Sequence, residues 1–425
     1  MKRKIYSLVI VLILVIQVFS VTVFAESSNE SSVGKSVSVQ IMHTNDHHSH
    51  LESAPYNLEF DGVSTRVNIG GFSNLASVIE ENRNENTLVL NSGELAGTLY
   101  FSMFKGEVDF KVFNELGLDA YALGNHAFDE GDARLAELID MANFPIVSSN
   151  VRANEPSPLH DVNESIKPYV IKEIDGEKIG IIGILKVEKT KNSSLPSDDV
   201  VFSKEIETAK KYVSELEEKG VNKIILLSHV GYYNDFLLAE HVPGIDIIIG
   251  GDTHDLLGDE EELESVGLAQ SYSGQTGPFA GYTHGNYEEN PTIGEYPTVV
   301  ENSAGNPVYI FTAWQYAYGV GRFDVDFSAE GVVESIDGNI IVPVSGPYLQ
   351  RNDDGENVEV DEAVKTNIEA TIEKSPILTH AEKSTKGGDC RSSRDSYFRF
   401  CEPKTPLSRC QAGSDRDHGA PSLRV

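Results

Sequence analysis

The sequence predicts a layered α/β protein, and three observations support this fold class. Short apolar runs rich in β-branched residues alternate with amphipathic stretches between residues 37 and 255, which is typical of successive βα units. Several of these runs are continuously apolar, as expected of strands that are buried on both faces of a parallel sheet. The chain has 425 residues and 40% hydrophobic content, which is enough for a large core and for more than one domain.

Strands are predicted from the apolar runs in the order in which they occur along the chain. They cover residues 39–42, 87–90, 145–150, 179–184, 223–227 and 245–249, and strand character returns over 308–326. Helices are predicted where apolar residues recur at helical spacing. They cover residues 71–81, 109–116, 133–141, 205–219 and 361–374. Residues 258–307 lack such periodicity and are rich in Gly, Tyr, Pro, Asn and acids, so we expect a long surface excursion there.

The composition argues against a nucleic-acid-binding protein. The formal net charge is −32, and a surface of this sign repels nucleic acid. No nucleic acid partner is therefore expected.

The N-terminus has the pattern of an export signal. Residues 2–4 are basic, residues 5–24 are largely apolar, and residues 23–25 offer a cleavage site for a signal peptide spanning 1–25. An uncleaved membrane anchor is the alternative, because the apolar stretch is long for a signal peptide. Polar residues interrupt it, however, and favour cleavage, with a polar linker over 26–36. We therefore expect a secreted, cell-surface or periplasmic protein with no stable membrane span after cleavage.

The C-terminal segment differs in composition from the rest of the chain. Residues 386–425 are basic and contain all three cysteines, so the body of the protein has no disulfide framework. A natural basic tail is one interpretation of this aberrant segment. Out-of-frame translation after residues 383–386 is the other, and it fits the abruptness of the change.

Metal-ligating residue types follow several of the predicted strands. The groups are Asp46-His47-His48, Asn91-Ser92-Gly93-Glu94, Gly124-Asn125-His126, Ser228-His229 and Gly251-Asp252-Thr253-His254. Strands that end in such residues bring them to one edge of a sheet, where open α/β folds place their sites. Carboxylates mixed with imidazoles suit a pair of divalent metals, which can assist displacement at phosphorus.

These groups resemble the successive motifs of the calcineurin-like metallophosphoesterases, and among them the secreted 5′-nucleotidases and 2′,3′-cyclic phosphodiesterases. The motifs are residues 43–48, 91–94, 123–129 and 250–254, and the resemblance covers 37–345. It implies a four-layer α/β/β/α catalytic domain over 37–345. It also implies that the usual C-terminal substrate domain is largely absent, with 346–385 a linker and a helix leading toward it.

The resemblance further implies two divalent metal ions, of Mn, Zn, Co or Mg, and a ligand set for each. The implied ligands are Asp46, His48 and His254 for the first ion, Asn125, His229 and Asp252 for the second, and Glu94 as the bridge. His126 with Asp129 would stabilise the transition state and the leaving group. A metal-bound hydroxide would be the nucleophile.

The sequence departs from the family pattern at three of these positions. Glu94 stands where the family has Asp, Asp252 where it has His, and Ala127 where it usually has Glu. The longer Glu94 side chain shifts the bridging carboxylate, whereas metal sites tolerate only about ±0.2 Å in ligand distance. A carboxylate in place of imidazole adds negative charge and favours harder ions such as Mn²⁺ or Mg²⁺ over Zn²⁺.

Several of these residues also have simpler structural interpretations. Asp129 can be a loop acid, Asp252 a capping residue and Glu94 part of a turn. His47 is expected at the surface or supporting the ligands. The aromatic residues Trp314, Tyr316 and Tyr318 are expected in the core or at the rim of the site, and the acidic run 259–262 on a solvated face, with a calcium site a weak alternative.

Two functional hypotheses follow from the sequence. The first is an exported metal-dependent phosphoesterase that hydrolyses nucleotides or related small phosphate esters. The second is a truncated, degenerate family member that binds metal or nucleotide with little or no turnover, for which Glu94, Asp252 and the unusual tail are the support.

Overall fold

The computed structural model describes residues 34–268 and 294–381 of the chain. The predicted signal peptide, most of the linker that follows it and the basic tail lie outside these residues. All described residues belong to one compact unit, which ends at Glu382. The domain boundaries expected after residues 345 and 385 stay predictions.

The larger sheet is built around a parallel group, β1, β4, β5, β6 and β8, in which β1 pairs with β4 and β4 with β5. Antiparallel strands extend it on the other side of β1. In spatial order its strands are β2 (Ala54–Phe60), β3 (Val63–Ile69), β17 (Val333–Arg351), β16 (Val320–Phe327), β1 (Val37–Thr44), β4 (Thr87–Asn91), β5 (Ala120–Ala122), β6 (Ile146–Val147) and β8 (Ile166–Lys167), with β18 (Asn357–Glu359) and β19 (Leu378–His380) paired to β17.

The second sheet has a parallel centre of β10, β12, β13 and β15, with an antiparallel strand at each edge. In order its strands are β14 (Thr298–Glu301), β15 (Pro307–Phe311), β13 (Ile247–Ile249), β12 (Ile224–His229), β10 (Glu177–Leu185) and β9 (Tyr169–Ile174). A short separate pair joins β7 (Val151–Ala153) and β11 (Val200–Phe202).

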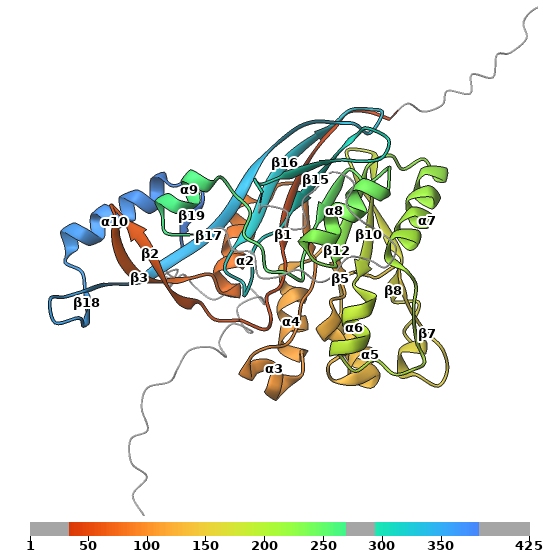
Figure 1. Cartoon of the computed structure of the whole chain (residues 1–425), viewed down its shortest axis with the longest axis horizontal. Helices are drawn as coiled ribbons and strands as arrows, with labels where there is room; N and C mark the ends of the chain where they lie inside the picture. Colours follow the sequence, from red (N-terminus) through yellow and green to blue (C-terminus); the bar gives the residue numbers. More distant parts are fainter. Residues whose placement is uncertain (1–33, 269–293, 382–425) are drawn as a thin grey trace, which may run out of the picture. The chain divides into compact units, whose positions relative to one another are not determined.

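The two sheets pack face to face with helices on their outer sides (Figure 1). Along β1, Val39 and Ile41 point into the core between the sheets, whereas Met42 packs in the core beneath the helices of the larger sheet. Those helices are α2 (Phe72–Asn82), α4 (Glu107–Leu116) and α5 (Gly131–Met141), and the second sheet carries α7 (Glu205–Glu218) and α8 (Tyr232–His241). The alternation produces a four-layer α/β/β/α arrangement, which confirms the predicted fold class.

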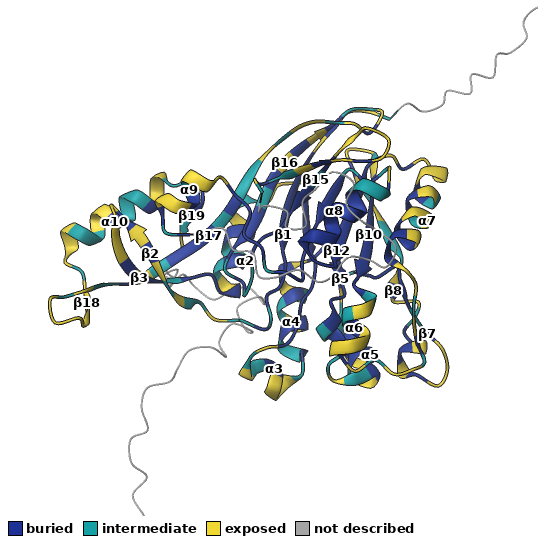
Figure 2. Cartoon of the chain, viewed as in Figure 1, coloured by how far each residue is buried: buried dark blue, intermediate teal, exposed yellow. Residues whose placement is uncertain are grey.

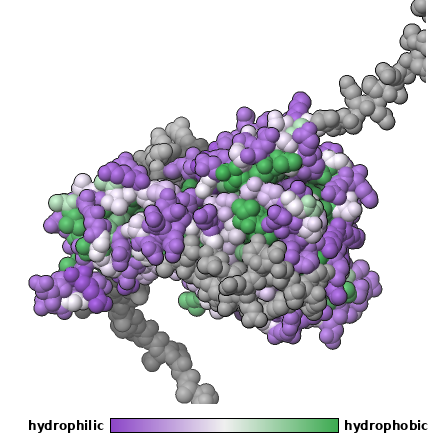
Figure 3. Space-filling view, turned by 45° about the horizontal axis from the view of Figure 1, so that its top comes forward, coloured by the Kyte–Doolittle hydropathy of each residue, from purple (hydrophilic) through white to green (hydrophobic). Residues whose placement is uncertain are grey.

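Figure 2 shows that burial follows these layers. The central strands are dark blue, and the outer surfaces of α5 and α7 carry exposed residues. In Figure 3 the visible face is largely hydrophilic, as expected for a chain of such high negative charge.

A third core cluster lies where the β2–β3 hairpin meets the C-terminal part of the described chain. Leu58 and Ile69 of the hairpin, Leu263 of α9 (Glu260–Ser265) and Ile372 of α10 (Glu362–Lys374) all belong to this cluster. The segment after residue 345 therefore contains β18, α10 and β19, and α10 packs on the same apolar cluster as β2, β3 and β17.

Most predicted elements occur close to the expected positions, and the differences are informative. The strand expected at 145–150 shortens to β6, and the region 308–326 divides into β15 and β16 with a loop between them. The expected excursion at 258–307 contains α9 and β14 in its described parts. The acidic run begins α9, where Asp259 caps the helix and residues 259–261 are exposed, as predicted.

A substitution in α10 tests whether this helix contributes to the stability of the unit. Ile372 is fully buried, so Ile372→Ala should lower the free energy of unfolding by about 2–5 kcal/mol. The exposed neighbour Glu373 gives a matched control, and Glu373→Ala should change it by no more than about 0.5 kcal/mol. Urea unfolding of both variants is the measurement; equal stabilities would contradict the packing of α10.

Candidate metal centre

The candidate site forms where the carboxyl ends of parallel strands in the two sheets come together. Asp46, Glu94 and Asn125 follow β1, β4 and β5, which are neighbours in the larger sheet. His229 ends β12, and the loop that carries Asp252 follows its neighbour β13. The rule that such sites lie beyond the carboxyl ends of strands therefore accounts for the position of the site.

Asp46, His48 and His254 converge closely enough to share one ion. The Nε2 atoms of His48 and His254 lie 2.9 Å apart. Asp46 Oδ1 lies 3.9 Å from His48 Nε2 and 3.8 Å from His254 Nε2. An ion at ~2.1 Å from each ligand permits ligand separations up to ~4.2 Å, so all three separations fit.

The backbone around these residues is unusual. Asp46, His48, Asp252 and His254 all have positive φ, at 46°, 47°, 86° and 61°. Non-glycine residues adopt this region rarely, and such strain concentrates at functional sites.

The carboxylate of Asp46 is held in place by donors on both sides. Asn45 Nδ2 donates to Oδ2 over 2.8 Å, and the backbone N–H of Asp252 donates to Oδ2 over 2.9 Å. Burial raises the pKa of Asp46 above its ordinary value, and the nearby His229 and His254 oppose this only in part. The hydrogen bond from the backbone N–H of Asp252 to Asp46 links the loop after β1 with the loop after β13.

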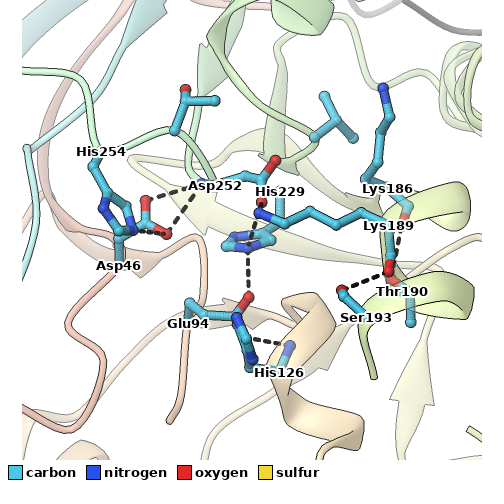
Figure 4. Close-up of polar contacts among 12 residues, drawn as sticks. Asp46, Glu94, His126, Lys186, Lys189, Thr190, Ser193, His229, Asp252 and His254 are labelled. Carbon is cyan, nitrogen blue, oxygen red and sulfur yellow. Dashed lines mark hydrogen bonds and ion pairs between the residues drawn. The ribbon is translucent and has the colours of Figure 1, made fainter. Parts of the chain in front are cut away.

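Glu94 is the centre of a second group of side chains (Figure 4). Its Oε1 accepts a hydrogen bond from the backbone N–H of His126 over 2.8 Å, and its Oε2 lies 2.8 Å from His229 Nε2. Burial acts to raise the pKa of Glu94, but His229, His126 and His48 together outweigh burial and lower the pKa.

The amide of Asn125 lies beside the same carboxylate. Its nitrogen donates a hydrogen bond to Glu94 Oε2 over 3.0 Å, and its oxygen accepts one from the backbone N–H of His126 over 3.3 Å.

His229 is oriented by its backbone partner. Its Nδ1 lies 2.6 Å from the carbonyl oxygen of Ser92, so Nδ1 donates and Nε2 faces Glu94. A backbone carbonyl on one ring nitrogen is the usual way to direct the other toward a metal. Burial opposes protonation of His229, but the charge of Glu94 raises its pKa above the ordinary value.

Asp252 is bound by a lysine that the sequence analysis did not identify. Lys189, on α6 (Val187–Ser193), donates a hydrogen bond to Asp252 Oδ1. The Asp252 side chain is fully buried, whereas that of Lys189 is 30% exposed. Burial acts to lower the pKa of Lys189, but Asp252 outweighs it and raises the pKa. The available signal was position, because α6 begins directly after β10 at the same sheet edge.

A missing side chain at residue 124 makes room for the longer Glu94. A Cβ atom on Gly124 would lie 2.6 Å from the Glu94 carboxyl carbon and from its Oε1. The backbone of Gly124 is extended, with φ of −96°, so space and not conformational freedom requires glycine here.

His126 and Asp129 form the pair that the sequence predicts. His126 Nδ1 lies 2.6 Å from Asp129 Oδ2 within and just beyond the short helix η1 (Asn125–Phe128). Burial lowers the pKa of His126, but the hydrogen bond to Asp129 and the charge of Glu94 outweigh it and raise the pKa. The rings of His126 and His48 lie 5.6 Å apart between centroids, which places the pair beside the Asp46 group.

Three side chains near the motifs lie in the core or beside the metal-ligating residues. His47 is fully buried, not at the surface, because its Nε2 bonds Asp109 Oδ1 at 3.1 Å and its ring packs against Phe113. Trp314 is 2% exposed and lies in the core, as predicted. Tyr316 lies at the Asp46 group, with its ring 5.3 Å from that of His254.

The layered fold and the histidine, carboxylate and amide groups at its strand ends define a metallophosphoesterase type of protein. The family model for calcineurin-like phosphoesterases matches residues 39–256. The chain therefore belongs to the calcineurin-like phosphoesterase family.

Two relatives show which members of this family the chain is similar to. The chain is 38% identical over 348 residues to a probable 5′-nucleotidase of Treponema pallidum, covering 81% of this chain and 54% of that protein. It is 40% identical over 301 residues to the NAD 5′-nucleotidase of Haemophilus influenzae, covering 70% and 46%. The chain spans about half the length of these relatives.

Solved structures agree with this placement. The NAD nucleotidase of Haemophilus influenzae superposes with a TM-score of 0.71 at 36% identity, covering 82% of this chain and 58% of that chain. A 5′-nucleotidase precursor from Thermus thermophilus gives 0.59 at 34% identity, covering 72% and 54%.

The close approach at Gly124 generates a prediction about Glu94. Gly124→Ala should displace the Glu94 carboxylate and lower the free energy of unfolding by about 1–3 kcal/mol, because overpacking of a filled site is unfavourable. The same substitution should cost clearly less in a Glu94→Asp background, since the shorter side chain withdraws the carboxylate. Denaturant unfolding of the four proteins measures this coupling; an equal cost in both backgrounds would show that Glu94 is not the obstacle.

Proposed function

We propose that this protein is an exported, divalent-metal-dependent phosphoesterase that hydrolyses nucleotides, of the 5′-nucleotidase or 2′,3′-cyclic nucleotide phosphodiesterase type. The observation that carries the proposal is the convergence of Asp46, His48 and His254 beside the His126–Asp129 pair. The names of the relatives, which are nucleotidases, support the nucleotide class of substrate.

The first ion has a suitable set of ligands in Asp46, His48 and His254, since all three ligand separations fit one ion. A divalent ion bound there supplies the positive charge and the activation of water that hydrolysis of a phosphate ester requires. Asn45 and the backbone of Asp252 keep the Asp46 carboxylate oriented for this role.

His126 has the properties of a general acid. Its Nδ1 donates to Asp129, which fixes the tautomer and favours the protonated ring, so the ring can give a proton to the leaving-group oxygen. Glu94 holds the backbone N–H of His126 and so positions the imidazole relative to the Asp46 group.

Glu94, Asn125, His229 and Asp252 are the residues that would hold a second ion. The arrangement around them does not fit such an ion as it stands, because the Lys189 ammonium is already bound to Asp252. We therefore derive the mechanism from the first ion and from the residues alone. The two-ion count stays a prediction.

Export is proposed from the basic and apolar N-terminal pattern of residues 1–25. Within residues 34–268 and 294–381, no helix is both long enough and apolar enough to cross a bilayer.

We assign no residue to stacking of a nucleobase: the Trp314 side chain is buried in the core.

The alternative function is a protein that binds metal or nucleotide with little or no turnover. One structural observation favours it, namely the Lys189–Asp252 ion pair within the ligand group. The two functions differ in a single measurable quantity, which is hydrolysis of a phosphate ester bond by the folded protein.

The proposed activity is tested with two substrates, each with Mn²⁺, Zn²⁺, Co²⁺ and Mg²⁺ in turn. Release of phosphate is measured with 5′-AMP, and opening of the ring to a nucleoside monophosphate is measured with a 2′,3′-cyclic nucleotide. The full chain should hydrolyse at least one of the two substrates with at least one of these ions. His126→Ala should reduce the rate by about 10²–10⁴-fold, because it removes the general acid.

The exposed His160 provides the matched control, and His160→Ala should leave the rate unchanged. If the folded parent protein hydrolyses neither substrate with any of the four ions, the alternative without turnover is correct instead.

A further inference from the structure

Lys189 reaches into the ligand group from outside both sheets. It lies on the short helix α6, and its ammonium is bound to the fully buried carboxylate of Asp252 (Figure 4). The Lys189 side chain is 30% exposed, so it extends from the surface to a fully buried carboxylate.

The oxygen that the ammonium holds is the one that faces the rest of the group. Asp252 Oδ1 lies 3.8 Å from His229 Nε2, which in turn lies 2.8 Å from Glu94 Oε2. An ion shared by His229 and Asp252 would use this oxygen. The ammonium of Lys189 and a divalent cation would then repel each other at one carboxylate.

The arrangement of the ligating side chains also favours a single metal site. Among the described residues, Asp46, His48 and His254 are the group of three or more ligating side chains that converges on one point. Glu94, His229 and Asp252 form close pairs but no comparable set. A permanent positive charge at Asp252 also offsets part of the repulsion among three buried carboxylates.

We propose that the ammonium of Lys189 takes the place of the second divalent ion, so that the protein binds one ion, at Asp46, His48 and His254. The inference rests on the metal site of the proposed function and specifies its stoichiometry. It also connects the lysine at residue 189 with the carboxylate at residue 252. A carboxylate at residue 252, where the family has imidazole, attracts an ammonium that a neutral ring would not attract.

A competing account starts from the other oxygen of Asp252. Oδ2 is buried, and no group within residues 34–268 and 294–381 forms a hydrogen bond with it. If Lys189 merely fixes Oδ1 so that Oδ2 binds a second ion, removal of the lysine must weaken metal binding. If Lys189 occupies the second position, its removal must strengthen metal binding. The two accounts therefore predict opposite changes in metal binding when the Lys189 side chain is removed.

The experiment measures metal stoichiometry and not activity. The full chain and its variants are freed of metal with a chelator, titrated with Mn²⁺ or Zn²⁺ by calorimetry, and analysed for bound metal by mass spectrometry. The parent should bind about one ion, and Lys189→Met about two, because the charge is removed while the side-chain length is kept.

Two further variants serve as controls. Lys191 lies on the same helix, with its ammonium 5.5 Å from the centre of the Phe202 ring, and Lys191→Met should still bind about one ion. Lys189→Arg keeps the positive charge and should also stay at about one ion, which gives a readout even if Lys189→Met does not fold.

The outcomes separate the inference from the function on which it rests. Equal stoichiometry in the parent and Lys189→Met, or a loss of metal in Lys189→Met, overturns the inference while the metal site stands. No bound metal in any folded variant overturns the proposed metal site as well, and with it the inference.

Discussion

The repulsion among three buried carboxylates is the constraint on which this site depends. Asp46, Glu94 and Asp252 are all buried at the junction of the two sheets. Charges of one sign in a poorly solvated region are costly unless cations or donors compensate them. His229 faces Glu94, Lys189 binds Asp252, and Asn45 with a backbone N–H binds Asp46. The polar contacts around the site are best understood as this compensation.

The fold makes the constraint unavoidable. β1, β4 and β5 run parallel, as do β12 and β13, so the residues that follow them must meet at one edge. The loops that carry Asp46 and Asp252 have positive φ at these residues, and glycine at residue 124 leaves room for the Glu94 carboxylate. The sheets thus determine which residues lie close together. The loops determine which charged side chains are present there and how these are oriented.

Much of this arrangement was predictable from the residues because strands buried on both faces are continuously apolar, as in 224–227 and 247–249. The β2–β3 hairpin was not predicted, since its exposed face is polar and it contains Pro55. Helix α8 was also missed, because residues 232–239 are buried all around and leave no amphipathic pattern. Lys189 was not singled out, although its helix begins directly after β10 at the same sheet edge, because a lysine on a polar helix does not by itself indicate its partner.

The most direct test of the account is an anomalous-scattering map from crystals of the full chain grown with Mn²⁺ or Zn²⁺. The account predicts one strong peak, bounded by Asp46, His48 and His254, with the Lys189 ammonium still at Asp252. A second peak of similar height between Glu94, His229 and Asp252, with Lys189 displaced, would contradict it. The absence of any peak at Asp46 would remove the metal centre on which the whole account rests.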